Sequence, residues 1–178
     1  MTGERRASVH LPIVLVGFMA AGKSKIGRLL AERLGLPFID VDKEIEAASG
    51  KSVAEIFSED GEAEFRRAER AMISRVIERG AAVIAAGGGA FVDHDTREAL
   101  NASTRTVWLD PPFDLILARL DRSNSRPLAS GKSEEELRAL WTERRPCYAE
   151  AHVRIETSDE DPASAVEQIL AALGDSGV

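Results

Sequence analysis

The chain alternates short apolar runs with longer segments whose apolar residues recur at helical spacing. The apolar runs are typical of buried strands, because most are continuous and rich in β-branched residues. Strands are predicted at residues 13–16, 37–39, 82–85, 106–109 and 152–155. Helices are predicted at residues 23–34, 62–79, 113–120 and 163–173. Strands that alternate with helices predict an α/β fold, a parallel sheet with both faces covered by helices.

Two stretches fit this alternation less well. Residues 41–59 have helical spacing but are broken at Ser49-Gly50, which predicts short helices over one edge of the sheet. Residues 123–133 are rich in Ser, Gly, Asn and Pro, and loops of that length are often lids. In an open α/β sheet, ligands bind at the carboxyl ends of the strands. The residues expected at those ends are Gly17, Asp40, Gly87 and Asp110.

Length and composition indicate one soluble domain. The 178 residues are 44% hydrophobic and 30% charged, and the formal net charge of −7 argues against general nucleic-acid binding. The single Cys147 excludes an internal disulfide framework and fits a reducing compartment. No apolar run approaches the roughly 18 to 20 residues of a membrane span. We expect a loose tail at residues 1–10, one domain at residues 11–174 and a cytoplasmic location.

Residues 17–24, GFMAAGKS, match the pattern G-x-x-x-x-G-K-[ST] between a predicted strand and a predicted helix. Glycines let backbone N–H groups turn inward around phosphate oxygens, and the helix N-terminus adds partial positive charge. Lys23 can then reach the β- and γ-phosphates, and the Ser24 hydroxyl can ligate Mg²⁺. The alternative is a glycine-rich turn with a chance lysine, expected in roughly 1 in 100 chains of this length. The pattern and its context favour nucleotide binding.

Two carboxylates follow the second predicted strand, in the segment FIDVD. Asp40, if it faces the phosphate loop, can hold Mg²⁺ through water, because that ion keeps much of its hydration shell. Asp42 would then point to the neighbouring cleft, where a carboxylate can accept a proton from a hydroxyl nucleophile. The alternative is a pair of acidic residues that stabilise the start of a helix through its dipole.

Further candidates carry positive charge or lack a side chain. Arg66 could bind a carboxylate bidentately, or belong to a solvated helix face. The glycines at 87–89 would let a substrate approach the backbone closely, or form a flexible loop. Arginines also gather around the predicted lid, which suggests a site for anionic charge or a solvated surface. These arginines are Arg119, Arg122, Arg126, Arg144 and Arg145.

Taken together, the motifs resemble those of shikimate kinases. The matching segments are GFMAAGKS, FIDVD, GEAEFRRAE, AAGGGAF, RPLASG and ERRPCYAEA, in that order. The resemblance extends from Ile13 to about Leu173 and implies a three-layer P-loop NTPase fold with a five-stranded parallel sheet in the order 2-3-1-4-5. It also implies ATP-dependent phosphorylation of the shikimate 3-hydroxyl, giving 3-phosphoshikimate and ADP in chorismate and aromatic amino-acid biosynthesis. Mg²⁺ would be the cofactor and the chain a monomer, without membrane or nucleic-acid partners.

The resemblance assigns roles to individual residues on the nucleotide side. The catalytic residues would be Lys23, Asp42 and Arg126, with Arg126 in a lid at about residues 121–133 that closes over the phosphates. Arg119 would lie near adenine. The metal environment would comprise Ser24 and, through water, Asp40. The ATP-binding set would be Gly17, Ala20, Ala21, Gly22, Lys23, Ser24, Lys25, Arg119 and Arg126.

On the acceptor side, the resemblance implies a shikimate-binding segment at about residues 41–70. Asp42 would bind shikimate hydroxyls and serve as the base, and Arg66 and Arg144 would hold the carboxylate. The chemistry agrees, because an acceptor with one acid group and several alcohols needs planar cations and an acceptor carboxylate. The complete substrate-binding set would be Asp42, Arg66, Gly87, Gly88, Gly89 and Arg144.

The chain departs from the family pattern at three places. Ala20 stands where glycine is frequent, a change that a negative φ would tolerate. Ala129 replaces a more usual leucine in the lid, and residues 158–161 lack an arginine.

Two kinds of alternative function remain. One is a gluconate or nucleoside monophosphate kinase of the same fold. The other is a non-catalytic nucleotide-binding module, although a degenerate module would be expected to have lost at least one of the residues Lys23, Ser24, Asp40, Asp42 and the lid arginine.

Overall fold

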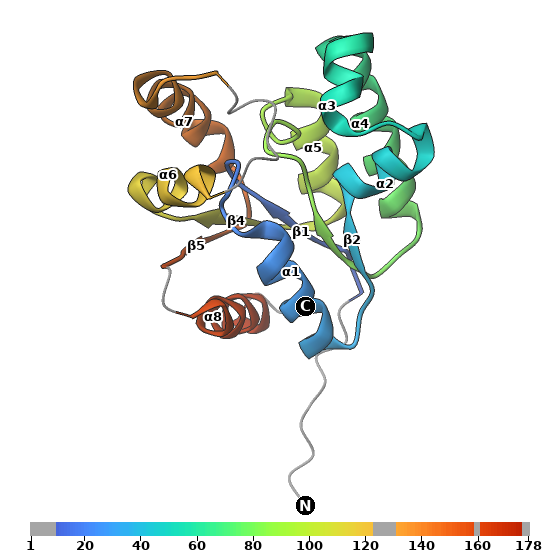
Figure 1. The fold of residues 1–178 in the computed structure, drawn as a ribbon. Coiled ribbons are helices and arrows are strands. Elements are labelled where there is room, and N and C mark those ends of the chain that lie inside the picture. Colours follow the sequence, from blue (N-terminus) through green and yellow to red (C-terminus); the bar gives the residue numbers. More distant parts are fainter. Residues whose placement is uncertain (1–9, 123–130, 159–160, 176–178) are drawn as a thin grey trace, which may run out of the picture.

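The computed structural model describes residues 10–122, 131–158 and 161–175, and Figure 1 shows a twisted central sheet between two layers of helices. All of the strand pairs are parallel. The strand order is β2-β3-β1-β4-β5, which confirms the order implied by the resemblance. The strands are β1 (Ile13–Val16), β2 (Phe38–Asp40), β3 (Val83–Ala85), β4 (Arg105–Asp110) and β5 (Val153–Glu156).

The two helical layers bury different faces of the sheet. One face is covered by α1 (Lys23–Leu34) and α8 (Pro162–Asp175). The other face is covered by α2 (Val41–Ser49), α3 (Val53–Glu55), the π-helix η1 (Ile56–Asp60), α4 (Glu62–Glu78), α5 (His94–Ser103), α6 (Phe113–Asp121) and α7 (Glu134–Tyr148). No helix among the described residues combines the length and apolar character needed to cross a membrane.

The central strand β1 shows why the strands are continuous apolar runs. Successive side chains of a strand point to opposite faces of the sheet. Ile13 and Leu15 pack with α1 and α8, whereas Val14 and Val16 pack with the opposite layer. All four side chains are fully buried. Burial on both faces removes the polar alternation that a half-exposed strand would show.

The short helices α2 and α3, followed by η1, confirm the expectation for residues 41–59. Helices α5 and α7 were not predicted. Helix α5 buries few apolar side chains, and α7 contains Pro146 within its span. A capping box stabilises the N-terminus of α7: the Ser133 hydroxyl accepts a hydrogen bond from the Glu136 N–H, and the Glu136 carboxylate accepts one from the Ser133 N–H. Residues 1–9 of the predicted tail, and 123–130 of the predicted lid with Arg126 and Ala129, lie outside the described residues.

Candidate active site

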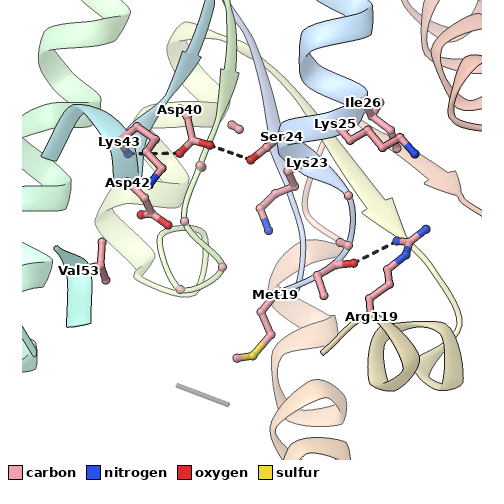
Figure 2. Close-up of a pocket in the computed structure, with 18 of the residues that line it drawn as sticks. Met19, Lys23, Ser24, Lys25, Ile26, Asp40, Asp42, Lys43, Val53 and Arg119 are labelled. Atoms are coloured by element: carbon pink, nitrogen blue, oxygen red, sulfur yellow. Dashed lines mark hydrogen bonds between the residues drawn. The ribbon is translucent and has the colours of Figure 1, made fainter. Parts of the chain in front are cut away.

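The phosphate-loop motif lies between β1 and α1, as its sequence context predicts. Gly17 has φ +142°, and a Cβ there would lie 2.6 Å from the Leu109 carbonyl oxygen, so only glycine fits. Gly22, with φ +99°, caps the N-terminus of α1. The Lys23 ammonium is buried and donates to the Gly17 and Phe18 carbonyl oxygens, each at 2.9 Å. The loop therefore presents a cation at the N-terminus of a helix (Figure 2), which is a site for phosphate.

Ala20 does not meet the condition under which alanine would be tolerated at this position. Its φ is +59°, so the negative φ that would accommodate alanine is absent, and it is the only non-glycine residue with positive φ in the described parts of the chain. An alanine Cβ in this left-handed region crowds the following carbonyl oxygen and costs about 1–2 kcal/mol. The Ala20 carbonyl oxygen accepts a hydrogen bond of 3.1 Å from Arg119 Nη1 (Figure 2). Arg119 thus contacts the strained turn directly.

Asp40 lies beside the phosphate loop at the carboxyl end of β2. It accepts a hydrogen bond of 2.7 Å from the Ser24 hydroxyl through Oδ2, and it caps α2 by accepting from the Lys43 N–H at 3.4 Å (Figure 2). A hydroxyl and a carboxylate next to a phosphate loop are oxygen donors of the kind that Mg²⁺ prefers. The residues present therefore fit a magnesium ion, which Ser24 and Asp40 would hold beside the phosphate loop.

Asp42 lies in the first turn of α2 and faces a different neighbour. A Cβ on Gly87 would lie 3.2 Å from Asp42 Oδ1, so this carboxylate is next to the glycine loop that follows β3. The two carboxylates of FIDVD therefore separate as predicted, one toward the phosphate loop and one toward the neighbouring part of the cavity.

Arg66 on α4 is held by two glutamates of its own helix. Nη1 forms an ion pair of 2.7 Å with Glu69 Oε2, and Nη2 lies 3.4 Å from Glu62 Oε1. Glu69 is only 2% exposed, and this burial raises the pKa of its carboxyl group, whereas the Arg66 charge acts in the opposite direction. Glu69 was not predicted as a site residue from the sequence, although its spacing of three residues from Arg66 places both on one helix face.

The three glycines leave room for these charged groups. A Cβ on Gly87 would collide with Glu69 Oε1, and a Cβ on Gly89 would collide with the Arg66 guanidinium. The segment is therefore packed against side chains, which argues against a merely flexible loop, and the close approach of a substrate stays a prediction. These side chains belong to α4 and line the cavity together with the glycines.

Arg144 and Arg145 are adjacent in α7, but their side chains contact different parts of the structure. Arg145 binds Asp110 bidentately, at 2.6 and 2.9 Å, and lies over the rings of Trp108 and Trp141. Arg145 and Asp110 therefore anchor α7 to β4. Arg144 lines the cavity, and its Nη1 is buried without a hydrogen-bond partner among the described residues. A buried donor of this kind favours an anionic ligand.

One cavity of about 560 Å³ joins these groups at the carboxyl ends of the strands. Gly17 contributes a carbonyl oxygen to Lys23 but does not line the cavity, and Arg126 lies outside the described residues. Lining residues that the sequence analysis did not propose include Met19, Lys43, Val53, Phe57 and Glu69. The predicted residues that line it are Ala20, Ala21, Gly22, Lys23, Ser24, Lys25, Asp40, Asp42, Arg66, Gly87, Gly88, Gly89, Arg119 and Arg144.

Comparison with known proteins agrees with this architecture. The family model described as shikimate kinase matches residues 19–174. A shikimate kinase of Caulobacter vibrioides is 49% identical over 162 residues, which cover 90% of this chain and 81% of the relative. The structure of shikimate kinase from Acinetobacter baumannii in complex with shikimate has a TM-score of 0.91 and 38% identity, covering 95% of this chain and 96% of that one.

A gluconokinase from Sinorhizobium meliloti shares the fold alone. Its TM-score is 0.62 at 19% identity, with coverage of 95% of this chain and 94% of that one. The gluconate alternative is therefore not favoured over the much closer likeness described above. The family match spans most of the domain, and this chain belongs to the shikimate kinase family.

Proposed function

We propose that the family reaction, transfer of the terminal phosphoryl group of ATP to the shikimate 3-hydroxyl, is carried out by the residues that this cavity brings together. The observation that carries the proposal is the single cavity with a phosphate loop at one side and a carboxylate and two arginines at the other. On the nucleotide side, the backbone of the loop from Gly17 to Ser24 would bind the phosphates, and Lys23 would stabilise charge that develops during transfer.

On the acceptor side, Arg66 and Arg144 would bind the carboxylate and Asp42 the hydroxyl groups. Asp42 can also accept the proton of the attacking hydroxyl, because a carboxylate within hydrogen-bond reach of a nucleophile acts as a general base. The Arg66–Glu69 ion pair supports this arrangement, since it fixes a planar guanidinium against Gly89. The proton leaves the hydroxyl for the Asp42 carboxylate as the oxygen bonds to phosphorus and the ADP oxygen leaves.

Ser24 and Asp40 would hold a magnesium ion, Ser24 through its hydroxyl and Asp40 through water. When bound, the ion neutralises charge on the phosphate oxygens. The Ser24–Asp40 hydrogen bond supports this assignment, because it already places both oxygen atoms beside the loop.

We further propose a lid, an adenine-side role for Arg119, a monomeric state and a cytoplasmic location. The predicted lid at residues 121–133 would bring Arg126 over the γ-phosphate, and Arg119 would lie on the adenine side. A monomer suffices, because one chain supplies both halves of the cavity, and the single Cys147 fits the cytoplasm.

Arg66→Lys tests the acceptor side. Lysine keeps the charge but not the planar two-donor geometry. Loss of a charge-assisted hydrogen bond, about 1.5–3 kcal/mol, predicts a fall of about ten- to a hundredfold in kcat/KM for shikimate. The KM for ATP should stay within about twofold. Arg67→Lys is the matched control, because Arg67 is an exposed neighbour paired with Glu64 on the same helix.

A more discriminating version of the Arg66→Lys experiment uses a shikimate analogue whose carboxylate is reduced to an alcohol. The parent should turn this analogue over poorly, and Arg66→Lys should add little further loss, since two ways of deleting one contact are not additive. Independent, additive losses would show that Arg66 does not touch the carboxylate, and Arg144 would have to bind it alone.

A further inference from the structure

Tyr148, at the end of α7, is the single tyrosine of the chain. It is 1% exposed and does not line the cavity. Its hydroxyl donates a hydrogen bond of 2.5 Å to the carbonyl oxygen of Gly88, across 60 positions of sequence. A buried hydroxyl that reaches the backbone of a distant loop ties the two segments together.

Gly88 lies where the two halves of the cavity meet. A Cβ on Gly88 would lie 3.3 Å from the backbone nitrogen of Met19, so the residue packs directly on the phosphate loop. Its neighbours in sequence, Gly87 and Gly89, pack on Glu69 and Arg66. The carbonyl oxygen bound by Tyr148 therefore belongs to a turn that contacts both the nucleotide side and the acceptor side.

Tyr148 also lies close to the second arginine of the acceptor site. Arg144 precedes it by four residues, and residues at this spacing lie one above the other on a helix face. Burial raises the pKa of Tyr148 to about 12, whereas the charges of Arg144 and Arg66 oppose this rise. The phenol is protonated and able to donate at neutral pH, as an ordinary tyrosine is, and it lies within electrostatic reach of both arginines.

Helix α7 is fixed at two points close to Arg144, both on its C-terminal side. The Arg145–Asp110 ion pair ties it to β4, and the Tyr148–Gly88 hydrogen bond ties it to the glycine turn. We propose that Tyr148 is a positioning residue for acceptor binding, which acts through Gly88 and Arg144 and holds Arg144 in register with Arg66. This proposal rests on the roles proposed above for the two arginines.

Tyr148→Phe removes the hydroxyl and keeps the ring. We expect the KM for shikimate to rise about tenfold, in line with the loss of one buried hydrogen bond, while kcat stays within about threefold and the KM for ATP within about twofold. The matched control is Thr106→Val. Thr106 is fully buried near the start of β4, and its hydroxyl donates to Asn101 at 2.7 Å and accepts from the His152 N–H at 3.0 Å, away from the cavity. This control should lower the melting temperature and leave both KM values unchanged.

A cycle with Arg144→Ala separates positioning from general stability. If Tyr148 acts through Arg144, Tyr148→Phe should add little to the KM of the Arg144→Ala protein. An unchanged shikimate KM in the single variant, or a full additional loss in the double variant, would overturn the proposal. The proposed function has a separate criterion, because it fails if the parent does not phosphorylate shikimate, whatever the Tyr148 variants do.

A second measurement leaves Tyr148 itself in place. Because the chain has one tyrosine, growth on 3-fluorotyrosine labels position 148 alone. Shikimate should shift the ¹⁹F resonance in a saturable titration in the parent, and much less in the Arg144→Ala protein. A resonance that does not respond to shikimate at saturation would contradict the proposed link.

Discussion

Gly89→Ala should separate stability from acceptor binding, because the added methyl group meets a flexible functional side chain. An alanine Cβ at this position would lie 2.6 Å from both Cζ and Nη1 of Arg66 and closer still to Nη2. Ordinary van der Waals contact begins near 3.4 Å, so the guanidinium has to retreat by about 1 Å. Gly89 is not among the residues with positive φ, so the backbone itself accommodates alanine.

The variant should stay folded while acceptor binding weakens. The Arg66 guanidinium is the end of a long side chain that is 17% exposed, so it can move without repacking the apolar core, but its retreat stretches the 2.7 Å ion pair with the buried Glu69. We therefore expect a loss of stability of about 1–3 kcal/mol, the range for a buried polar group left unpaired, or about 2–12 °C in melting temperature. A displacement of 1 Å in a positioning group costs on the order of a hundredfold in rate, so kcat/KM for shikimate should fall by about ten- to a hundredfold.

The assay is steady-state ADP release at varied shikimate and at varied ATP, with a thermal melt of each protein. Gly174→Ala is the control, because a Cβ at that position in α8 meets nothing within 4 Å. Gly89→Ala should raise the KM for shikimate and leave the KM for ATP within about twofold. A normal shikimate KM in a folded Gly89→Ala protein would refute the placement of Arg66 at the acceptor.

Three further predictions concern other groups of the structure. Asp42→Asn should lower kcat by about 10²- to 10⁴-fold, the range for loss of a general base, with the KM for ATP little changed; a change confined to the ATP KM would move Asp42 to the nucleotide side. Ala20→Gly should raise the melting temperature by a few degrees, because relief of about 1–2 kcal/mol of strain exceeds the added chain entropy of about 0.4–1 kcal/mol; an unchanged or lower melting temperature would contradict the strained φ. His152 has its pKa lowered by burial and by the Arg105 charge, and its Nδ1 accepts from the Thr106 N–H. At acidic pH the folded state then binds fewer protons than the unfolded state. The stability from this group is therefore present above about pH 6.5 and is lost as the pH falls through the lowered pKa of His152. Thermal melts from pH 8 to 5 should show less dependence on pH in the His152→Gln protein than in the parent.

The fold was largely predictable because its strands are buried on both faces. Continuous apolar runs such as Ile13–Val16 carry that signal in the sequence. Helix α7 was missed for a physical reason, since its 15 residues bury only Leu137 and Tyr148 and include Pro146. Its start depends on a capping box, and its position depends on ion pairs with Asp110, which sequence spacing does not reveal.

The candidate site was predictable where chemistry and spacing coincide. The phosphate loop and the two aspartates of FIDVD have fixed relations to strands, so their placement followed from the pattern. Glu69 and Tyr148 were missed because their importance arises from tertiary contacts with Gly87 and Gly88. The positive φ of Ala20 was also hidden, since alanine gives no sign of left-handed backbone.

We conclude that this cavity phosphorylates shikimate with ATP as the phosphoryl donor. The most direct measurement is ADP release by the purified protein with Mg²⁺ and ATP, in parallel with shikimate, with gluconate and with no acceptor. The structure predicts release that depends on shikimate, with a phosphate monoester formed in equal amount and detected by ³¹P NMR. Release that is the same without an acceptor, or that is faster with gluconate than with shikimate, would contradict the account.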